Sequence, residues 1–306
     1  MSGGLLVLGD VVTDVVAVHR EPPAPATDTA AVIRILPGGA GANVACWAAH
    51  AGLADVGLLA RVGADRSGWH EEFLLRAGVR PRLVVDSCAP TATVVSLVDA
   101  SAGAERSFLT DSGATLRLCR ADWSPDLLDG VAHLHVSGYL FFAEASRELA
   151  LIALRDARSR GVPASVDPAS AGFIADFGVS RFLAAVEGVS MLLPNRDEAR
   201  LLTGLPDPVD AAAKLSRHVP LVVSTQGAQG ALVAESGAVT ARIPAVSAQA
   251  VDSTGAGDAF TGALLAALLS GCGPVAAAEE GCRAGAEAVA GMGGRPRAGE
   301  TAPGRR

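Results

Sequence analysis

The sequence of 306 residues lacks features that several classes of proteins require. Aromatic residues make up only 4% of it, which argues against a surface that stacks nucleic-acid bases. The net charge is −7, which argues against a basic patch for nucleic acid or for a membrane surface. The longest apolar run, residues 263–269, is too short to span a bilayer, and no basic-then-apolar leader precedes the first apolar segment. We therefore expect no nucleic-acid partner, no membrane partner and no secretory signal.

Cysteine is also scarce. The cysteines are scattered, odd in number and form no CxxC pair, so the sequence predicts neither a zinc site nor a disulfide framework. They are Cys46, Cys88, Cys119, Cys272 and Cys282. Reduced thiols are the usual state in the cytoplasm, and the expected location is therefore cytoplasmic.

Hydrophobic residues are abundant, at 50% of the chain, so a large core can be buried. Short apolar runs typical of buried strands alternate with helical segments along the whole sequence. This order predicts an α/β fold, a doubly wound and mostly parallel sheet with helices on both faces. We expect it to occupy residues 1–294. The tail, residues 295–306, is rich in Gly, Pro and Arg and is expected to be disordered.

The stretch 251–271 organises the chemistry of the chain. A bend of small residues, Gly255, Ala256 and Gly257, precedes a run of helix formers. Backbone N–H groups at such a bend, together with the positive end of the helix, make a site for an anion. Asp258 follows directly and would repel a bound anion, but it could accept a proton from a nucleophile that attacks a phosphoryl group. The alternative is a glycine turn with an aspartate that caps a buried helix.

Polar residues follow the first apolar strand, residues 5–8. Ligands of open α/β sheets bind at the carboxyl ends of strands, so Asp14 is placed to accept hydrogen bonds from a polyol. Gly38 and Gly39 lead into a helix and permit close approach of a ligand to the backbone. Asn43 can both donate to and accept from a sugar hydroxyl. The alternatives are a surface turn at Asp14 and a tight turn before the helix.

Two further segments suit a nucleotide. Asn195 begins a helix, and Glu198 three residues later gives the spacing of a capping box, which is a sufficient structural explanation. Thr225 follows another apolar strand, and Gly227 and Gly230 permit a nucleotide to lie close to the backbone.

Together these stretches resemble the ribokinase-like (PfkB-type) carbohydrate kinases. Residues 252–260, DSTGAGDAF, are similar to that family's signature DTTGAGDAF, with Ser253 in place of one Thr. Residues 38–45 match its GGxxxNxA signature, and residues 195–198 and 225–230 match its NxxE and TxGxxG motifs. The motifs occur in the family's order, and the resemblance covers about residues 5–289.

The resemblance implies transfer of the γ-phosphoryl group of ATP to a hydroxyl, primary in most cases, of a sugar. Asp258 would be the base, and the amides of Gly255, Ala256 and Gly257 would hold the developing charge. Asp14, Gly38, Gly39 and Asn43 would bind the acceptor, and Asn195, Thr225, Gly227 and Gly230 would bind ATP. Glu198 would hold Mg²⁺ through water, and Asp252 a monovalent cation such as K⁺. Segments at about 15–36 and 91–112 would form a small β-sheet lid that also joins two copies in a homodimer.

The acceptor stays open at this point. Ala40 stands where typical ribokinases have lysine, so the resemblance does not establish ribose as the acceptor. Thr91 stands where sugar-phosphate kinases tend to have arginine, which weighs against a phosphorylated acceptor. A nucleoside kinase of the same family is the alternative within the class. A non-catalytic sugar-binding regulator is the alternative outside it, and the intact Asp258 argues against it.

Overall fold

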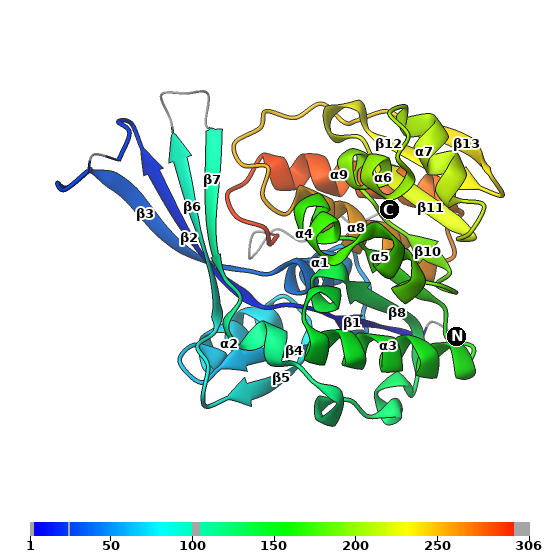
Figure 1. Cartoon of the computed structure of the whole chain (residues 1–306), viewed down its shortest axis with the longest axis horizontal. Coiled ribbons are helices and arrows are strands. Elements are labelled where there is room, and N and C mark those ends of the chain that lie inside the picture. Colours follow the sequence, from blue (N-terminus) through cyan, green and yellow to red (C-terminus); the bar gives the residue numbers. More distant parts are fainter. Residues whose placement is uncertain (1–2, 24, 100–104, 297–306) are drawn as a thin grey trace.

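A mixed sheet of nine strands runs through the centre of the molecule (Figure 1). The computed structural model describes residues 3–23, 25–99 and 105–296. In sheet order the strands are β13 (Ala238–Ile243), β12 (Ala231–Glu235), β11 (Leu221–Thr225), β10 (Met191–Leu192), β9 (Ala164–Asp167), β8 (Val131–Ser137), β1 (Gly4–Leu8), β4 (Val56–Gly63) and β5 (Arg80–Asp86). Every pairing from β11 to β5 is parallel, and β12 and β13 add an antiparallel edge.

Helices cover both faces of this sheet. On one face lie α1 (Ala40–His50), α2 (Ser67–Arg76), α8 (Ala256–Leu269) and α9 (Pro274–Val289). On the other lie α3 (Glu144–Ser159), α4 (Ala171–Phe177), α5 (Val179–Ala185), α6 (Arg196–Thr203) and α7 (Pro208–Leu215). Since side chains alternate along a strand, Leu5 and Val7 of β1 pack under the first group, while Leu6 and Leu8 pack under the second. Both faces are thus buried, which explains the continuous apolar strands of the sequence.

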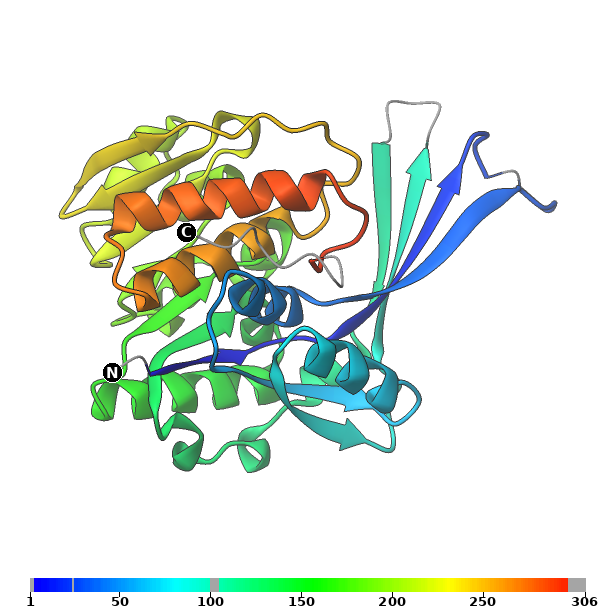
Figure 2. The same cartoon turned by 180° about the vertical axis from the view of Figure 1, so that it is seen from behind.

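A second sheet of four strands projects from the side of this α/β body (Figures 1 and 2). Its strands, in order, are β3 (Ala31–Gly38), β2 (Val12–His19), β6 (Ala92–Asp99) and β7 (Glu105–Asp111). This sheet, called the lid below, is built from the two segments in which the sequence predicts a lid. The tip of its second hairpin lies outside the described residues.

The segment after α9 corrects one expectation. The disordered tail was expected to begin at Arg295. Instead, Nη2 of Arg295 donates a hydrogen bond to the carbonyl oxygen of Gly38 at 3.0 Å, so this residue is held at the root of the lid. The physical reason is that two glycines, Gly293 and Gly294, let the chain turn back and pack on α1 and the lid. Residues 297–306 lie outside the described residues. Among the residues that the structure describes, no helix is long and apolar enough to cross a membrane.

Candidate active site

A cavity of about 510 Å³ opens between the α/β body and the lid. Its floor is formed where β1, β8 and β9 end, at Asp10, Ser137 and Asp167, and by the first turn of α8. The lid contributes side chains such as Val94 and Phe108. The carboxyl ends of parallel strands therefore meet a helix N-terminus here, as expected for a ligand site in an open α/β sheet.

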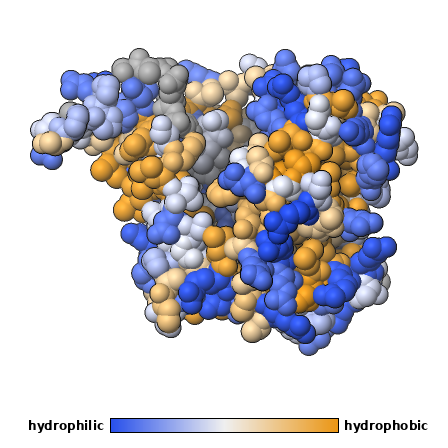
Figure 3. All heavy atoms as spheres, in the orientation of Figure 1, coloured by the Kyte–Doolittle hydropathy of each residue, from blue (hydrophilic) through white to orange (hydrophobic). Residues whose placement is uncertain are grey.

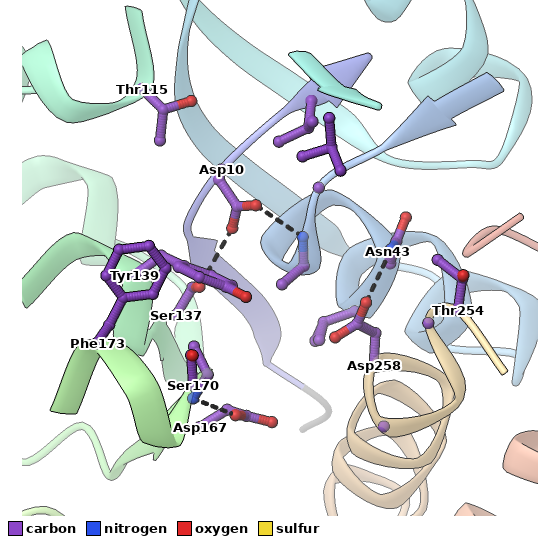
Figure 4. A pocket seen from close by; sticks show the side chains of 18 of the residues that line it. Asp10, Asn43, Thr115, Ser137, Tyr139, Asp167, Ser170, Phe173, Thr254 and Asp258 are labelled. Carbon is purple, nitrogen blue, oxygen red and sulfur yellow. Dashed lines mark hydrogen bonds between the residues drawn. The ribbon is translucent and has the colours of Figure 1, made fainter. Parts of the chain in front are cut away.

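Asp258 and Asn43 face each other across this floor (Figure 4). Nδ2 of Asn43 donates a hydrogen bond to Oδ2 of Asp258 at 2.8 Å. Burial, opposed by the Asn43 hydrogen bond and reinforced by the charges of Asp167, Asp10 and Asp14, raises the pKa of Asp258 to about 8. An aspartate with such a pKa is a strong enough base to take a proton from a hydroxyl that is being phosphorylated.

The bend before α8 has the geometry of an anion site. Gly255 adopts φ 74° and directly precedes the helix, and a side chain there would collide with Gly294. A Cβ on Gly257 would meet no atom within 4 Å, because this residue faces the open pocket. Gly255, Gly257 and Asp258 line the cavity, whereas Ala256 does not. The backbone of Gly255 and Gly257 is thus exposed to the cavity at the helix N-terminus without side chains in front of it, whereas the N–H of Ala256 donates to the carbonyl oxygen of Ser253 at 3.4 Å.

The part of the pocket around the start of α1 is organised by a residue that the sequence analysis did not assign to the site. Asp10 accepts hydrogen bonds from the backbone N–H groups of Ala40 at 2.8 Å and Gly41 at 3.1 Å, and from Oγ of Ser137 at 3.2 Å. It is 5% exposed. Asp10 therefore fixes the first turn of α1 to the ends of β1 and β8. The signal in the sequence was its place directly after the first strand.

Asp14 lies on β2 and lines the same cavity, together with Gly39 and Asn43. Gly38 does not line it, but a Cβ on Gly38 would collide with the Asp14 carboxylate, so the close approach requires glycine. Burial is the main cause that raises the pKa of Asp14 to about 7. The charges of Asp10 and Asp252 add to the rise and that of Arg295 opposes it.

Asn195 and Glu198 form the capping box that their spacing predicts. Oδ1 of Asn195 accepts from the N–H of Glu198 at 2.9 Å, and Oε2 of Glu198 accepts from the N–H of Asn195 at 2.8 Å. Both side chains also line the cavity. Burial and the neighbouring Asp167 raise the pKa of Glu198 above its usual range. The structural and the functional interpretations of this motif are therefore compatible.

The predicted nucleotide loop is only partly at the cavity. Thr225 ends β11 and lines the cavity, and it pairs with Asn195 in a parallel bridge. Gly227 and Gly230 flank a short 3-10 helix and do not line the cavity. Gly230 packs against the backbone of Ile243. The structure thus gives Gly230 a packing role in addition to any role in binding.

Asp252 lies in the turn that precedes α8 and accepts two backbone hydrogen bonds there. Its Oδ1 accepts from the N–H of Thr254 at 2.8 Å and its Oδ2 from the N–H of Gly293 at 3.0 Å. It is 4% exposed and does not line the cavity. These bonds tie the turn before α8 to the segment after α9.

An aromatic wall, which the sequence analysis did not predict, stands opposite Asn43 and Asp258 (Figure 4). Tyr139 and Phe173 line the cavity, with ring centroids 5.9 Å apart. Phe142 stacks on Phe173 from behind, at 5.2 Å and an interplanar angle of 20°. These residues come from the end of β8 and from α4, and no local spacing in the sequence relates them.

The charges at the cavity are of one sign. Acidic side chains that line it are Asp10, Asp14, Asp111, Asp167, Glu198 and Asp258. None of the described residues that line it is Lys or Arg. Such a site fits divalent cations that arrive with a polyphosphate, because hard cations prefer carboxylate and phosphate oxygens. In the described part of the chain, no group of three or more His, Cys, Asp or Glu side chains is arranged to hold a metal ion alone.

Comparisons with known proteins show the family to which the chain belongs. The model of the pfkB family carbohydrate kinases matches residues 3–299. A fructokinase from Klebsiella pneumoniae is 31% identical over 284 residues, which cover 88% of this chain and 85% of the fructokinase.

Two solved structures have the same fold. The adenosine kinase from Sinorhizobium meliloti superposes with a TM-score of 0.85 at 23% identity, covering 97% of this chain and 96% of that one. A putative ribokinase II from E. coli, in complex with ATP and Mg²⁺, superposes with a TM-score of 0.83 at 22% identity, covering 95% and 94%. The predicted ribokinase-like α/β fold is confirmed, and the chain belongs to the pfkB family of carbohydrate kinases.

Proposed function

We propose that this carbohydrate kinase transfers the γ-phosphoryl group of ATP to a primary hydroxyl of a sugar, with Asp258 as the general base. One observation carries the proposal: Asp258 lies in the first turn of α8, beside an open glycine bend, and is oriented by Asn43. A carboxylate is unfavourable beside a resting anion. Its place next to an anion site makes chemical sense if it takes the proton of the attacking hydroxyl.

The bend supports the same step. The N–H groups of Gly255, Ala256 and Gly257 lie at the positive end of α8, where negative charge develops on the transferring group. Because no side chain projects from Gly257 into the cavity, that group can approach the backbone. Asn43 keeps one oxygen of Asp258 engaged, so that the other can receive the proton.

The donor side fits ATP with Mg²⁺. Asn195, Thr225 and Glu198 line one end of the cavity, and Gly227 and Gly230 continue from Thr225. When bound, Mg²⁺ neutralises negative charge on the phosphates and so lets them enter a pocket lined by carboxylates. The charges next to the buried carboxyl of Glu198 are those of other carboxylates, Asp167 and Asp197, so a cation is favoured there. Glu198 would hold the Mg²⁺ ion through water.

The acceptor side fits a neutral polyol. Asp14 and Asn43 provide acceptors and a donor for hydroxyl groups, with Gly39 between them at the backbone. A phosphate near Asp14 would be repelled, and no lining Lys or Arg among the described residues would offset that repulsion.

A nucleoside is the second candidate acceptor, and the aromatic wall favours it. Tyr139 and Phe173 present ring surfaces on the side of the cavity away from Asp258. Stacking of a base on aromatic side chains contributes about 1–3 kcal/mol. A nucleoside would place its ribosyl hydroxyls at Asp14 and Asn43 and its base against these rings.

An acceptor screen tests the proposal. ADP release is measured for the purified protein with ketoses, aldoses, nucleosides and sugar phosphates, and the Asp258→Asn variant serves as the blank. Turnover of a free sugar supports the first candidate, and turnover of nucleosides alone supports the second. No phosphoryl transfer to any acceptor, together with tight sugar binding in calorimetry, would favour the non-catalytic regulator.

A monovalent cation near Asp252 belongs to the same proposal. The turn that Asp252 holds leads directly into the anion bend, so an ion there would act on the bend. Replacement of K⁺ by tetramethylammonium at constant ionic strength should then lower the rate. An unchanged rate would leave Asp252 with its turn-stabilising role alone.

We also propose a homodimer that forms through the lid. Apolar side chains are exposed there (Figure 3): Val32 at 61%, Ile33 at 63% and Leu109 at 62%. Contiguous exposed apolar surface marks interaction sites. Light scattering should show a dimer, and Ile33→Asp should yield monomers, whereas Val275→Asp on α9 should not. Since ATP is a cytoplasmic substrate and all five cysteines are free thiols, we place the enzyme in the cytoplasm.

A further inference from the structure

Residues 292–295, called here the C-terminal clasp, cross the root of the lid after α9 (Figure 2). The hydrogen bonds of the clasp are Arg34 Nη1 to Met292 Sδ (3.1 Å), Gly293 N to Asp252 Oδ2 (3.0 Å), Trp47 Nε1 to Gly294 O (2.9 Å) and Arg295 Nη2 to Gly38 O (3.0 Å). The clasp thus joins lid strand β3, the turn before α8 and helix α1. These are the elements that carry the candidate acceptor and phosphoryl sites.

Arg295 is the unusual member of the clasp. Its Nη2 reaches the carbonyl oxygen of Gly38, while Nε and Nη1 are buried and find no hydrogen-bond partner among the residues that the structure describes. Burial of a guanidinium without a full set of partners is unfavourable. The positive charge of Arg295 is therefore expected to have a favourable interaction with other groups at this position.

The charged groups around Arg295 indicate which interaction this is. The charged and titratable groups around Arg295 and Asp14 are Asp10 after β1, Asp252 and Asp258 beside α8, Cys46 on α1 and His70 on α2. His70 is buried with a lowered pKa, caused mainly by burial, so it carries no positive charge at neutral pH. Within the described part of the chain, Arg295 is therefore the cation that offsets the carboxylates around Asp14.

A short physical path links Arg295 to Asp14. Arg295 holds the carbonyl of Gly38, and a Cβ on Gly38 would collide with the Asp14 carboxylate, so these two residues are close neighbours. Arg295 does not line the cavity, so its guanidinium lies outside the space that an acceptor would occupy. It can therefore act on Asp14 through position and charge without touching the acceptor.

We propose that Arg295 is a positioning residue of the acceptor site, which fixes the Gly38 carbonyl and keeps the Asp14 carboxylate ionised for hydrogen bonds from acceptor hydroxyls. The role in acceptor binding rests on the proposed function. The effect on Asp14 does not, because it concerns two groups of the free protein. In agreement, the charge of Arg295 opposes the other causes that raise the pKa of Asp14.

The direct test is the titration of Asp14 in the protein without substrates. Aspartate carboxyl carbons labelled with ¹³C are followed by NMR from pH 5 to 9, and the Asp14 signal is identified by its absence in Asp14→Asn. Arg295→Met should raise the midpoint of that signal, and Arg295→Lys, which keeps the charge, should return most of the shift. Arg34→Met is the matched control, because it removes a clasp contact far from Gly38 and should leave the midpoint unchanged.

The kinetic test uses the acceptor found in the screen. Arg295→Met should lower kcat/KM for the acceptor about tenfold or more at pH 7 and move its acid limb to higher pH, with KM for ATP nearly unchanged. In an Asp14→Asn background the same substitution should have a much smaller effect. An unchanged Asp14 midpoint in Arg295→Met would overturn the proposal. If that variant does not fold, Arg295→Gln, which also removes the charge, takes its place, and an unchanged Asp14 midpoint in the folded Arg295→Gln would overturn the proposal too.

If wild type turns over no acceptor, the proposed function fails while the NMR result still decides the role of Arg295. The two failures are therefore distinguishable.

Discussion

Asn43 and Asp258 are 215 residues apart in the sequence and are joined by a hydrogen bond of 2.8 Å from Nδ2 to Oδ2. The bond connects the first helical turns of α1 and α8. These two helices cross so closely that a side chain at Gly262 of α8 would collide with α1. Helix α1, which carries Asn43, and helix α8, which carries Asp258, are thus packed together at their N-terminal turns. A substitution in either helix is expected to affect the position of the base.

Asp258→Asn should lower kcat by about 10²-fold or more, the range for loss of a positioned base. The fold should survive, because an asparagine at 258 can still accept the hydrogen bond from Asn43 through its amide oxygen. Single-turnover kinetics and circular dichroism measure the two effects. Turnover within a few-fold of wild type would remove Asp258 from the mechanism.

The two glycines of the bend should behave differently. Gly257→Val is expected to leave the melting temperature close to wild type, since a Cβ there meets nothing within 4 Å, and to reduce kcat more than it raises KM for ATP. Gly255→Ala should mainly destabilise the protein, because Gly255 has φ 74° and packs on Gly294. Thermal melts and steady-state kinetics on both variants check this. A raised KM for ATP with kcat unchanged in Gly257→Val would make the bend a ground-state binding loop.

Much of the fold and of the site was predictable because it is encoded locally. Apolar strand runs indicated the sheet, and the motif around Asp258 and the capping box at Asn195 are short contiguous patterns. Tyr139 and Phe173 were missed because they meet only through packing of α4 on the end of β8. Arg295 was assigned to a disordered tail because Gly-rich composition says nothing about tertiary contacts that hold it.

Glu198→Gln should raise the Mg²⁺ concentration for half-maximal rate by roughly threefold to tenfold. The carboxylate accepts from both N and Nδ2 of Asn195, at 2.8 and 2.7 Å, and a glutamine can keep only one of these bonds. A modest loss of stability is therefore expected alongside the change in Mg²⁺ dependence. Asp207→Asn, at the cap of α7, is the control for a change confined to a helix cap. An unaltered Mg²⁺ titration would leave the capping role as the full explanation.

Stability should fall as the pH rises from 6.5 to 8.5. The folded-state pKa of Asp258 is about 8 and that of Asp14 about 7, both above the ordinary value of 3.8, so the folded protein holds protons that the unfolded chain has released. The buried histidines have lowered pKa values and are neutral in the folded protein, but the unfolded chain still protonates them in part near pH 6.5, so they oppose this fall below about pH 7.5 and no longer contribute above it. Asp258→Asn should flatten the profile and raise the melting temperature at pH 8.5 by about 2–4 °C for each kcal/mol regained. Calorimetry at several pH values measures this, and equal slopes for both proteins would contradict it.

Asp14→Ala should show whether the acceptor is a neutral polyol held at the root of the lid. Asp14 lies on β2 against Gly38, and Thr225 lines the cavity on β11, toward the opposite edge of the large sheet. Removal of a charged hydrogen-bond acceptor is expected to reduce kcat/KM for the acceptor by about 1.5–3 kcal/mol, roughly 10- to 150-fold, while KM for ATP stays within a few-fold of wild type.

The pH dependence adds a second criterion for Asp14. Below pH 7 both Asp14, with a pKa of about 7, and the proposed base Asp258, with a pKa of about 8, become protonated, so wild-type kcat/KM for the acceptor should decline more steeply there than that of Asp14→Ala, which keeps only the limb of Asp258. Thr110→Val, on lid strand β7 at the same cavity, is a suitable control for a change of similar size. Unchanged acceptor kinetics would exclude hydroxyl binding by Asp14, and equal losses for both substrates would indicate a folding defect. A loss confined to the acceptor, together with a shallower acid limb, would establish that this carboxylate binds the acceptor in its ionised form.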